Sequence, residues 1–124
     1  MPIRGIRGAT TADANTRDAI LDATRELLTA LVAANDLRAD EIVSVIFTMT
    51  PDLDAAFPAS AARSLGWTDV ALLDARAPRV VNDVPRCIRV LIHWNTARTQ
   101  SEVQHVYLRA ARVLRPDRAG ERGD

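Results

Sequence analysis

The sequence lacks lysine, although it is 124 residues long and carries 16 basic side chains. All 16 are arginines, a bias that an arginine- and alanine-rich genome would also produce. Every cationic contact must therefore come from a planar guanidinium, the group whose geometry suits carboxylates. The 16 acidic residues balance this charge, so the composition gives no reason to expect binding to nucleic acid or to a membrane surface.

Cysteine and long apolar runs are also scarce. The single cysteine, Cys87, excludes an internal disulfide and a cysteine-rich zinc site, and its apolar neighbours favour a small buried residue over a reactive thiol. No stretch approaches the roughly 18 apolar residues of a membrane span, and no apolar segment follows the first residues as in a signal peptide. We therefore expect a cytoplasmic protein, with one domain over residues 1–117 and a polar tail over 118–124.

The motifs of common hydrolases and metalloenzymes are missing as well. There is no glycine-rich phosphate loop, no nucleophile elbow and no HExxH sequence. His93 and His105 share no metal-ligand spacing with a carboxylate cluster, and Ser60 and Ser64 have no evident base. The sequence therefore predicts no metal site.

The sequence does contain alternating strand and helix patterns. A helix is predicted from the cap residue Thr16 to about Ala34, and a short one from Pro58 to a C-cap at Gly66. Strand patterns rich in β-branched residues cover Ile3–Ala9, Ile42–Met49, Asp69–Leu73, Cys87–Trp94 and Val103–Leu108. This order predicts an α+β fold, a single domain with a mixed β-sheet and helices on one face. Because so few helices cannot cover a whole sheet, an oligomer is expected.

Arg89 is the residue that most needs an anion. The alternation of its strand places it on the opposite face from Val90 and Ile92, and a guanidinium that is buried there is unfavourable unless an anion pairs with it. The strand pattern alone leaves two interpretations open, a salt bridge to a protein carboxylate and the binding of an anionic ligand. Arg7 faces the same choice.

Taken singly, the other candidates favour structural roles. Arg63 and Arg115 have the pattern of solvated surface groups, and Tyr107 that of a core ring with a satisfied hydroxyl.

Five blocks change this interpretation, because their order and spacing match one family across residues 3 to 117. The blocks are Ile3–Thr11, Thr50–Leu53 with Ala56–Ala59, Cys87–Val90, His105–Leu108 and Val113–Asp117. Together they resemble the monofunctional AroH-type chorismate mutases, which rearrange chorismate to prephenate in aromatic amino acid biosynthesis. The resemblance implies a homotrimer of subunits resembling a pseudo-α/β barrel, with active sites at the subunit interfaces. It also implies that no cofactor is needed, because the rearrangement takes place within one molecule.

The resemblance further implies residue roles. Arg7, Arg89 and Tyr107 match catalytic positions that line the pocket from one subunit. Arg7 would pair with a substrate carboxylate, and Arg89 would reach the ether oxygen and a carboxylate. The neighbouring subunit contributes part of the remaining wall, and the matching substrate-binding positions are Phe57, Ala59, Arg63, Leu73, Leu114 and Arg115.

Two departures from the family pattern concern charge. The usual glutamate falls at Ala77, and a Cys- or Ser-like position three residues earlier falls at Asp74. Either Asp74 takes over the glutamate's catalytic role, near Arg89 and accepting a hydrogen bond from the substrate ring hydroxyl, or the pocket has lost activity and Asp74 is a strand-end turn residue. We favour the first interpretation. Ser60 stands where the family often has a lysine at the pocket entrance. The loss of this cation predicts weaker binding of chorismate, which is a dianion.

Two other functions stay open from the sequence. One is a non-catalytic chorismate-binding member of the family, for which Ala77 is the support. The other is an imine deaminase of the RidA type, a trimer with an interface arginine, against which the collinear blocks argue.

Overall fold

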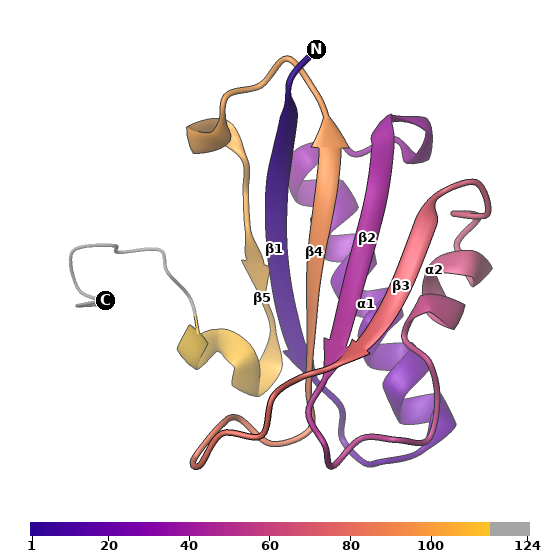
Figure 1. Ribbon diagram of the computed structural model, residues 1–124, viewed down its shortest axis with the longest axis vertical. Helices are drawn as coiled ribbons and strands as arrows, with labels where there is room; N and C mark the ends of the chain where they lie inside the picture. The colour runs from indigo at the N-terminus through magenta and orange to yellow at the C-terminus, as the bar shows by residue number, and fades with distance from the viewer. Residues whose placement is uncertain (115–124) are drawn as a thin grey trace.

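The computed structural model describes residues 1–114, and its centre is a five-stranded mixed sheet in the order β3-β2-β4-β1-β5 (Figure 1). The strands are β1 (Ile3–Thr11), β2 (Ile42–Met49), β3 (Ala71–Arg76), β4 (Cys87–Asn95) and β5 (Val106–Tyr107). β4 is antiparallel to both β1 and β2, whereas β2–β3 and β1–β5 are parallel pairs. Arg115 and the predicted tail over 118–124 lie outside the described residues.

Two α-helices, α1 (Arg17–Asn35) and α2 (Ala59–Ser64), cover one face of the sheet, behind it in Figure 1. Thr16 caps α1 as predicted, since its hydroxyl accepts a hydrogen bond from the Ala19 amide at 3.1 Å. Leu27, Leu28 and Leu31 of α1 are fully buried in the main core, in one cluster with Val90 and Ile92. The predicted α+β fold with a mixed sheet and helices on one face is confirmed.

Gly8 lets α1 approach the sheet closely. A Cβ atom built on Gly8 would lie 3.0 Å from the Leu31 Cδ1 atom and 3.2 Å from the Leu27 Cδ1 atom. Contacts this short are tighter than ordinary packing, so the absence of a side chain at Gly8 sets the distance between helix and β1.

Several boundaries differ from the predictions. β3 runs over Ala71–Arg76 instead of Asp69–Leu73, because its ladder with β2 continues as far as the Met49–Arg76 pair. Asp74 is therefore inside a strand and not at its end. β1 continues past Ala9 to Thr11, where it still pairs with β4.

The last predicted strand, Val103–Leu108, shortens to the two residues of β5. Two short 3₁₀ helices flank it, Gln100–Glu102 before and Arg109–Leu114 after; a third, Ala39–Glu41, precedes β2. The positive φ of Arg109, 52°, ends the extended backbone and begins the second of these helices.

The end of α1 holds the approach to β5. Asn35 is the last residue of α1, next to the predicted end at about Ala34, and Asp36 follows in a left-handed conformation with φ 56°. The buried Asn35 amide donates to the Gln104 carbonyl at 2.9 Å, and its oxygen accepts from the Gln104 amide at 2.8 Å. This paired contact fixes the segment that leads into β5.

Candidate active site

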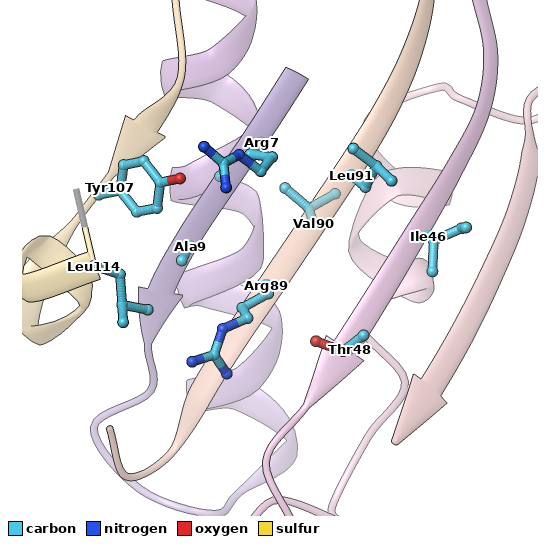
Figure 2. Close-up of a pocket in the computed structure, with 10 residues that line it drawn as sticks. Arg7, Ala9, Ile46, Thr48, Arg89, Val90, Leu91, Tyr107 and Leu114 are labelled. Atoms are coloured by element: carbon cyan, nitrogen blue, oxygen red, sulfur yellow. The ribbon is translucent and has the colours of Figure 1, made fainter. Parts of the chain in front are cut away.

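The sheet face opposite the α-helices carries a pocket of about 410 Å³ (Figure 2). That volume lies within the usual range for small-molecule sites. Its polar lining comes from Arg7, Thr48, Arg89 and Tyr107, and its apolar lining includes Ala9, Ile46, Leu91 and Leu114. These side chains come from β1, β2, β4, β5 and the 3₁₀ helix after β5.

Strand register explains why they converge. Arg89 on β4 pairs with Ala9 on β1 and with Thr48 on β2, so all three point to the same face. Tyr107 pairs with Ala9 across the β1–β5 ladder, which places its ring above the small alanine side chain. The predicted alternation of β4 is confirmed, since Val90 and Ile92 are buried against the helices whereas Arg89 and Leu91 are only partly buried.

Arg89 is paired with a carboxylate of its own chain. Its Nη2 donates to Oδ1 of Asp83 at 2.9 Å, and the two side chains are 33% and 21% exposed. The Arg89 guanidinium lowers the pKa of Asp83 below its usual value, chiefly through this hydrogen bond. Burial disfavours the charged form of Arg89, but the hydrogen bond to Asp83 and the charges around the guanidinium together outweigh this and raise its pKa. The salt-bridge interpretation of Arg89 is therefore the one observed in the single chain.

Arg7 is exposed on the same face, and its backbone is fixed by His105. The Arg7 amide donates to Nδ1 of His105 at 2.9 Å. Burial, and then the charge of Arg7, lower the pKa of His105, so the ring is neutral at pH 7 and Nδ1 acts as an acceptor. Figure 2 shows the Tyr107 hydroxyl turned toward the side of the pocket that carries Arg7.

A second group of predicted residues lies elsewhere. Asp74 pairs with Phe47 of β2, which is fully buried under the helices, so Asp74 points to the helix-covered face. There its Oδ1 accepts a hydrogen bond from the Ala59 amide at 3.0 Å. Burial raises the pKa of Asp74, although this hydrogen bond and the charge of Arg63 act in the opposite direction.

Within one chain, the expected proximity of Asp74 to Arg89 is therefore not found. The two side chains alternate to different faces of the sheet, because Phe47 pairs with both Asp74 and Val90. Asp74 instead lines a hollow of about 180 Å³ together with Phe57. Phe57 and Leu73 are large apolar side chains left 66% and 60% exposed.

Each of the remaining predicted residues belongs to one of these two groups. Ala59 is buried at the start of α2, and Arg63 is an exposed residue of that helix whose Nη2 lies 3.3 Å from the Ser60 hydroxyl. Leu114 is in the wall of the main pocket. The structure thus brings Arg7, Arg89, Tyr107 and Leu114 together, and places Phe57, Ala59, Arg63 and Asp74 around α2 and the end of β3.

Neither Asp83 nor the apolar wall formed by Ile46 and Leu91 was predicted from the sequence. Asp83 lies in the irregular loop between β3 and β4, where strand periodicity says nothing of side-chain direction. The alternation of β4 could have indicated this apolar wall, since it places Leu91 on the same face as Arg89. No group of three or more His, Cys, Asp or Glu residues within 1–114 could hold a metal ion.

The family profile described as chorismate mutase type I matches residues 3–118 of the sequence. The chain belongs to the type I chorismate mutase family. It is 53% identical over 116 residues to chorismate mutase AroH of Thermus thermophilus, covering 93% of this chain and 95% of that protein. It is 41% identical over 118 residues to chorismate mutase AroH of Bacillus subtilis, covering 94% and 93%.

A solved structure agrees with this assignment. A chorismate mutase from Clostridium thermocellum superposes with a TM-score of 0.86 at 48% identity, covering 88% of this chain and 97% of that chain. The resemblance carried by the five sequence blocks is thereby confirmed, and the RidA-type alternative is excluded. Identities of 53% and 41% show the family but not the roles of individual residues. The roles of Asp74 and Ala77 therefore stay predictions. No helix in the described part of the chain is long and apolar enough to cross a membrane.

Proposed function

We propose that the chain catalyses the rearrangement of chorismate to prephenate, with Arg89 as the principal catalytic residue. The observation that carries the proposal is the position of this guanidinium, held on the central strand β4 in a pocket that also contains Arg7 and Tyr107. Two cations in a largely apolar pocket suit a small dicarboxylate, because guanidinium groups bind carboxylates in fixed geometry.

The reaction requires little beyond charge and shape. The ether C–O bond breaks as a C–C bond forms within the same molecule, and no proton or electron leaves the substrate. Negative charge gathers on the ether oxygen in the transition state, while positive charge develops on the ring. A fixed guanidinium directed at that oxygen therefore stabilises the transition state more than the ground state. Arg7 would hold a carboxylate, and the pocket walls would hold the enolpyruvyl arm over the ring.

We infer that the complete site is shared between the subunits of a homotrimer. In support of this, the predicted site residues of one chain do not form a single pocket, because Arg7, Arg89 and Tyr107 lie apart from the group around α2. Phe57 and Leu73 are also more exposed than large apolar residues of a finished binding site should be. In the proposed assembly Phe57, Ala59, Arg63, Leu73 and Asp74 of one subunit complete the pocket of the next. We also propose that Leu114 and Arg115 contact the substrate. The proposed location of the enzyme is the cytoplasm.

In this arrangement Asp74 accepts a hydrogen bond from the ring hydroxyl of a substrate bound mainly to the adjacent subunit. Its Oδ1 is occupied by the Ala59 amide, and a carboxylate has acceptor capacity beyond one such bond. The proposal thus retains Asp74 as a substitute for the family's glutamate in contacting substrate, across an interface.

The first experiment follows the disappearance of chorismate with purified protein, and uses Arg89→Ala as the paired variant. We expect turnover by the wild type and a loss of roughly 100- to 1000-fold in kcat for the variant. Binding of chorismate by the wild type without turnover would favour the non-catalytic alternative.

A second experiment tests the shared site. Arg89→Ala and Arg63→Ala chains would each be impaired in a different wall of the pocket. After the two variants are unfolded and refolded together, mixed trimers should contain some pockets with both wild-type walls, and activity should exceed the sum of the separate variants. A mixture no more active than its components would overturn the shared pocket, but turnover of chorismate by the wild type would still stand.

A further inference from the structure

The ion pair between Arg89 and Asp83 lies beside the proposed reaction site. Its Nη2–Oδ1 distance is 2.9 Å, and both side chains are partly buried. Arg89 lines the main pocket, whereas Asp83 lines an adjoining hollow of about 250 Å³ beneath the loop between β3 and β4. The pair therefore connects the pocket to this loop.

The Asp83 carboxylate is itself held in place. Its Oδ1 also accepts a hydrogen bond from the Val84 amide at 2.8 Å, and its backbone amide donates to the Val80 carbonyl at 3.2 Å. Asn82 just before it adopts a positive φ of 65°, a conformation that asparagine tolerates better than most residues. A tight turn thus presents the carboxylate in one direction.

The loop that carries this turn is anchored at both ends. The Ala77 amide donates to the Met49 carbonyl at 2.9 Å, where the loop leaves β3. At the other end the Arg86 amide donates to Oδ2 of Asp52 at 2.8 Å, and the Ala12 amide donates to the Arg86 carbonyl at 2.9 Å. A carboxylate on such a fixed loop can hold a flexible arginine in one orientation before any substrate arrives.

We propose that Asp83 is the positioning residue of Arg89, holding its guanidinium by Nη2 so that the remaining N–H groups are directed at the substrate. The inference rests on the proposed function. A guanidinium has five N–H donors, and within residues 1–114 the one hydrogen bond recorded from the Arg89 side chain goes to Asp83. Arginine side chains carry considerable rotamer entropy, so restraint by Asp83 prepares the electrostatic arrangement that the transition state needs.

Asp83 occupies the place beside Arg89 that was expected for Asp74. Asp74 lies on the other face of its own chain and contacts α2. The carboxylate beside Arg89 is Asp83, nine residues further along the chain, in the loop after β3. In this assignment Asp74 contacts substrate across the interface, and Asp83 orients the arginine from within the subunit.

An opposite role for Asp83 is competition, in which its carboxylate occupies the place of a substrate carboxylate and must be displaced. The two roles predict different kinetics. Loss of a positioning residue lowers kcat with little change in KM, because the misplaced arginine fails chiefly in the transition state. Loss of a competitor lowers KM and leaves kcat intact.

The experiment measures kcat and KM for chorismate with wild type, Asp83→Ala and Asp83→Asn. We expect Asp83→Ala to lower kcat roughly 10- to 100-fold, the size of effect that misplacing a reacting group produces, with KM changed by less than about threefold. Asp83→Asn keeps an oxygen acceptor for Nη2 and should recover part of the lost kcat. The matched control is Asp52→Asn, which alters a carboxylate that anchors the same loop through Arg86 without contacting Arg89. It should lower Tm while kcat stays near the wild-type value.

A double-mutant cycle tests independently whether Asp83 acts through Arg89. If Asp83 acts through Arg89, adding Asp83→Ala to Arg89→Ala should change kcat by less than about twofold. An equal loss in both backgrounds, a fall in KM with kcat retained, or unchanged kinetics in Asp83→Ala would each overturn the positioning role. In those three cases wild-type turnover would still stand, so the proposed function would survive. If the wild type fails to consume chorismate, the proposed function falls and the positioning role falls with it.

Discussion

The Asp74 carboxylate and the Ala59 amide are joined by a hydrogen bond of 3.0 Å, from the edge strand β3 to the first residue of α2. This contact fixes the start of a helix of only six residues, too short to be stable by itself. It also shows that Asp74 has a structural partner whether or not it contacts substrate. Stability and activity of Asp74 variants should therefore be measured separately.

Asp74→Asn should raise Tm modestly at pH 7 and leave it unchanged at low pH. Burial raises the pKa of Asp74 in the folded chain, so the folded state prefers the protonated form and loses stability as pH rises through that pKa. Asparagine resembles the protonated acid and still offers an oxygen to the Ala59 amide. Asp74→Ala removes that acceptor and should lower stability by about 1 kcal/mol. Thermal unfolding at pH 4 and pH 7 checks both; an asparagine variant less stable than alanine at pH 7 would contradict the account.

The same variant tests the proposed contact with substrate. With the fold intact, Asp74→Asn should lower kcat for chorismate because the neutral amide balances the ring's developing positive charge less well than a carboxylate. Steady-state kinetics at pH 7 measures this. Near-full turnover would show that Asp74 does not replace the family's glutamate.

Gly8→Ala should destabilise the protein by about 1–3 kcal/mol, in the range typical of overpacking. The new methyl group would lie 3.0 Å from the Leu31 Cδ1 atom and 3.1 Å from the Val90 Cγ1 atom. Gly5→Ala on the same strand is the matched control, since its Cβ would meet the Leu91 Cδ1 atom at an ordinary 3.7 Å. Urea unfolding compares the two; similar losses of stability would mean that close helix packing is not the reason for glycine at position 8.

Asn35→Ala should lower the free energy of unfolding by about 1–3 kcal/mol, because it removes the two hydrogen bonds to the backbone of Gln104. Those contacts are the 2.8 and 2.9 Å hydrogen bonds between α1 and the segment before β5. The control is Arg38→Ala, which breaks an exposed pair with Asp40 at 3.6 Å and should change stability by less than about 0.5 kcal/mol. A loss for Asn35→Ala no larger than the control's would remove Asn35 as the anchor of β5.

Ser60→Lys should lower KM for chorismate with kcat little changed. Position 60 is on α2 next to Arg63 in space, with the Ser60 hydroxyl 3.3 Å from the guanidinium. A second cation there would attract the dianion during encounter, and the effect should weaken as salt is raised. Ser60→Gln supplies length without charge as a control. A KM that is unchanged at low ionic strength would count against a role for this position in capture.

Local patterns in the sequence predicted much of the sheet and the direction of Arg89. Alternation along β4 decides which side chains share a face, and a continuous apolar stripe decides which side of α1 is buried. The partner of Arg89 could not be predicted in this way, because Asp83 reaches it from a loop whose turn depends on a positive φ at Asn82.

Local sequence patterns also could not predict that the site residues of one chain form two separate groups. The resemblance implied that two subunits contribute, but only the β2–β3 register places Asp74 under the helices and away from Arg89. The strand continues three residues further than predicted, so Asp74 lies within the ladder and not at the strand end.

The short ladder between β5 and β1 has only two pairs, Gly8–Val106 and Ala9–Tyr107. Arg89, by contrast, stands in a strand bonded along both edges. Free energies of local opening follow such differences, so amide hydrogens around Tyr107 should exchange with deuterium well before those around Arg89. We then expect the pocket to have a stable wall around Arg89 and a wall around Tyr107 that opens locally, so that a ligand can enter and leave past Tyr107 while Arg89 stays in place.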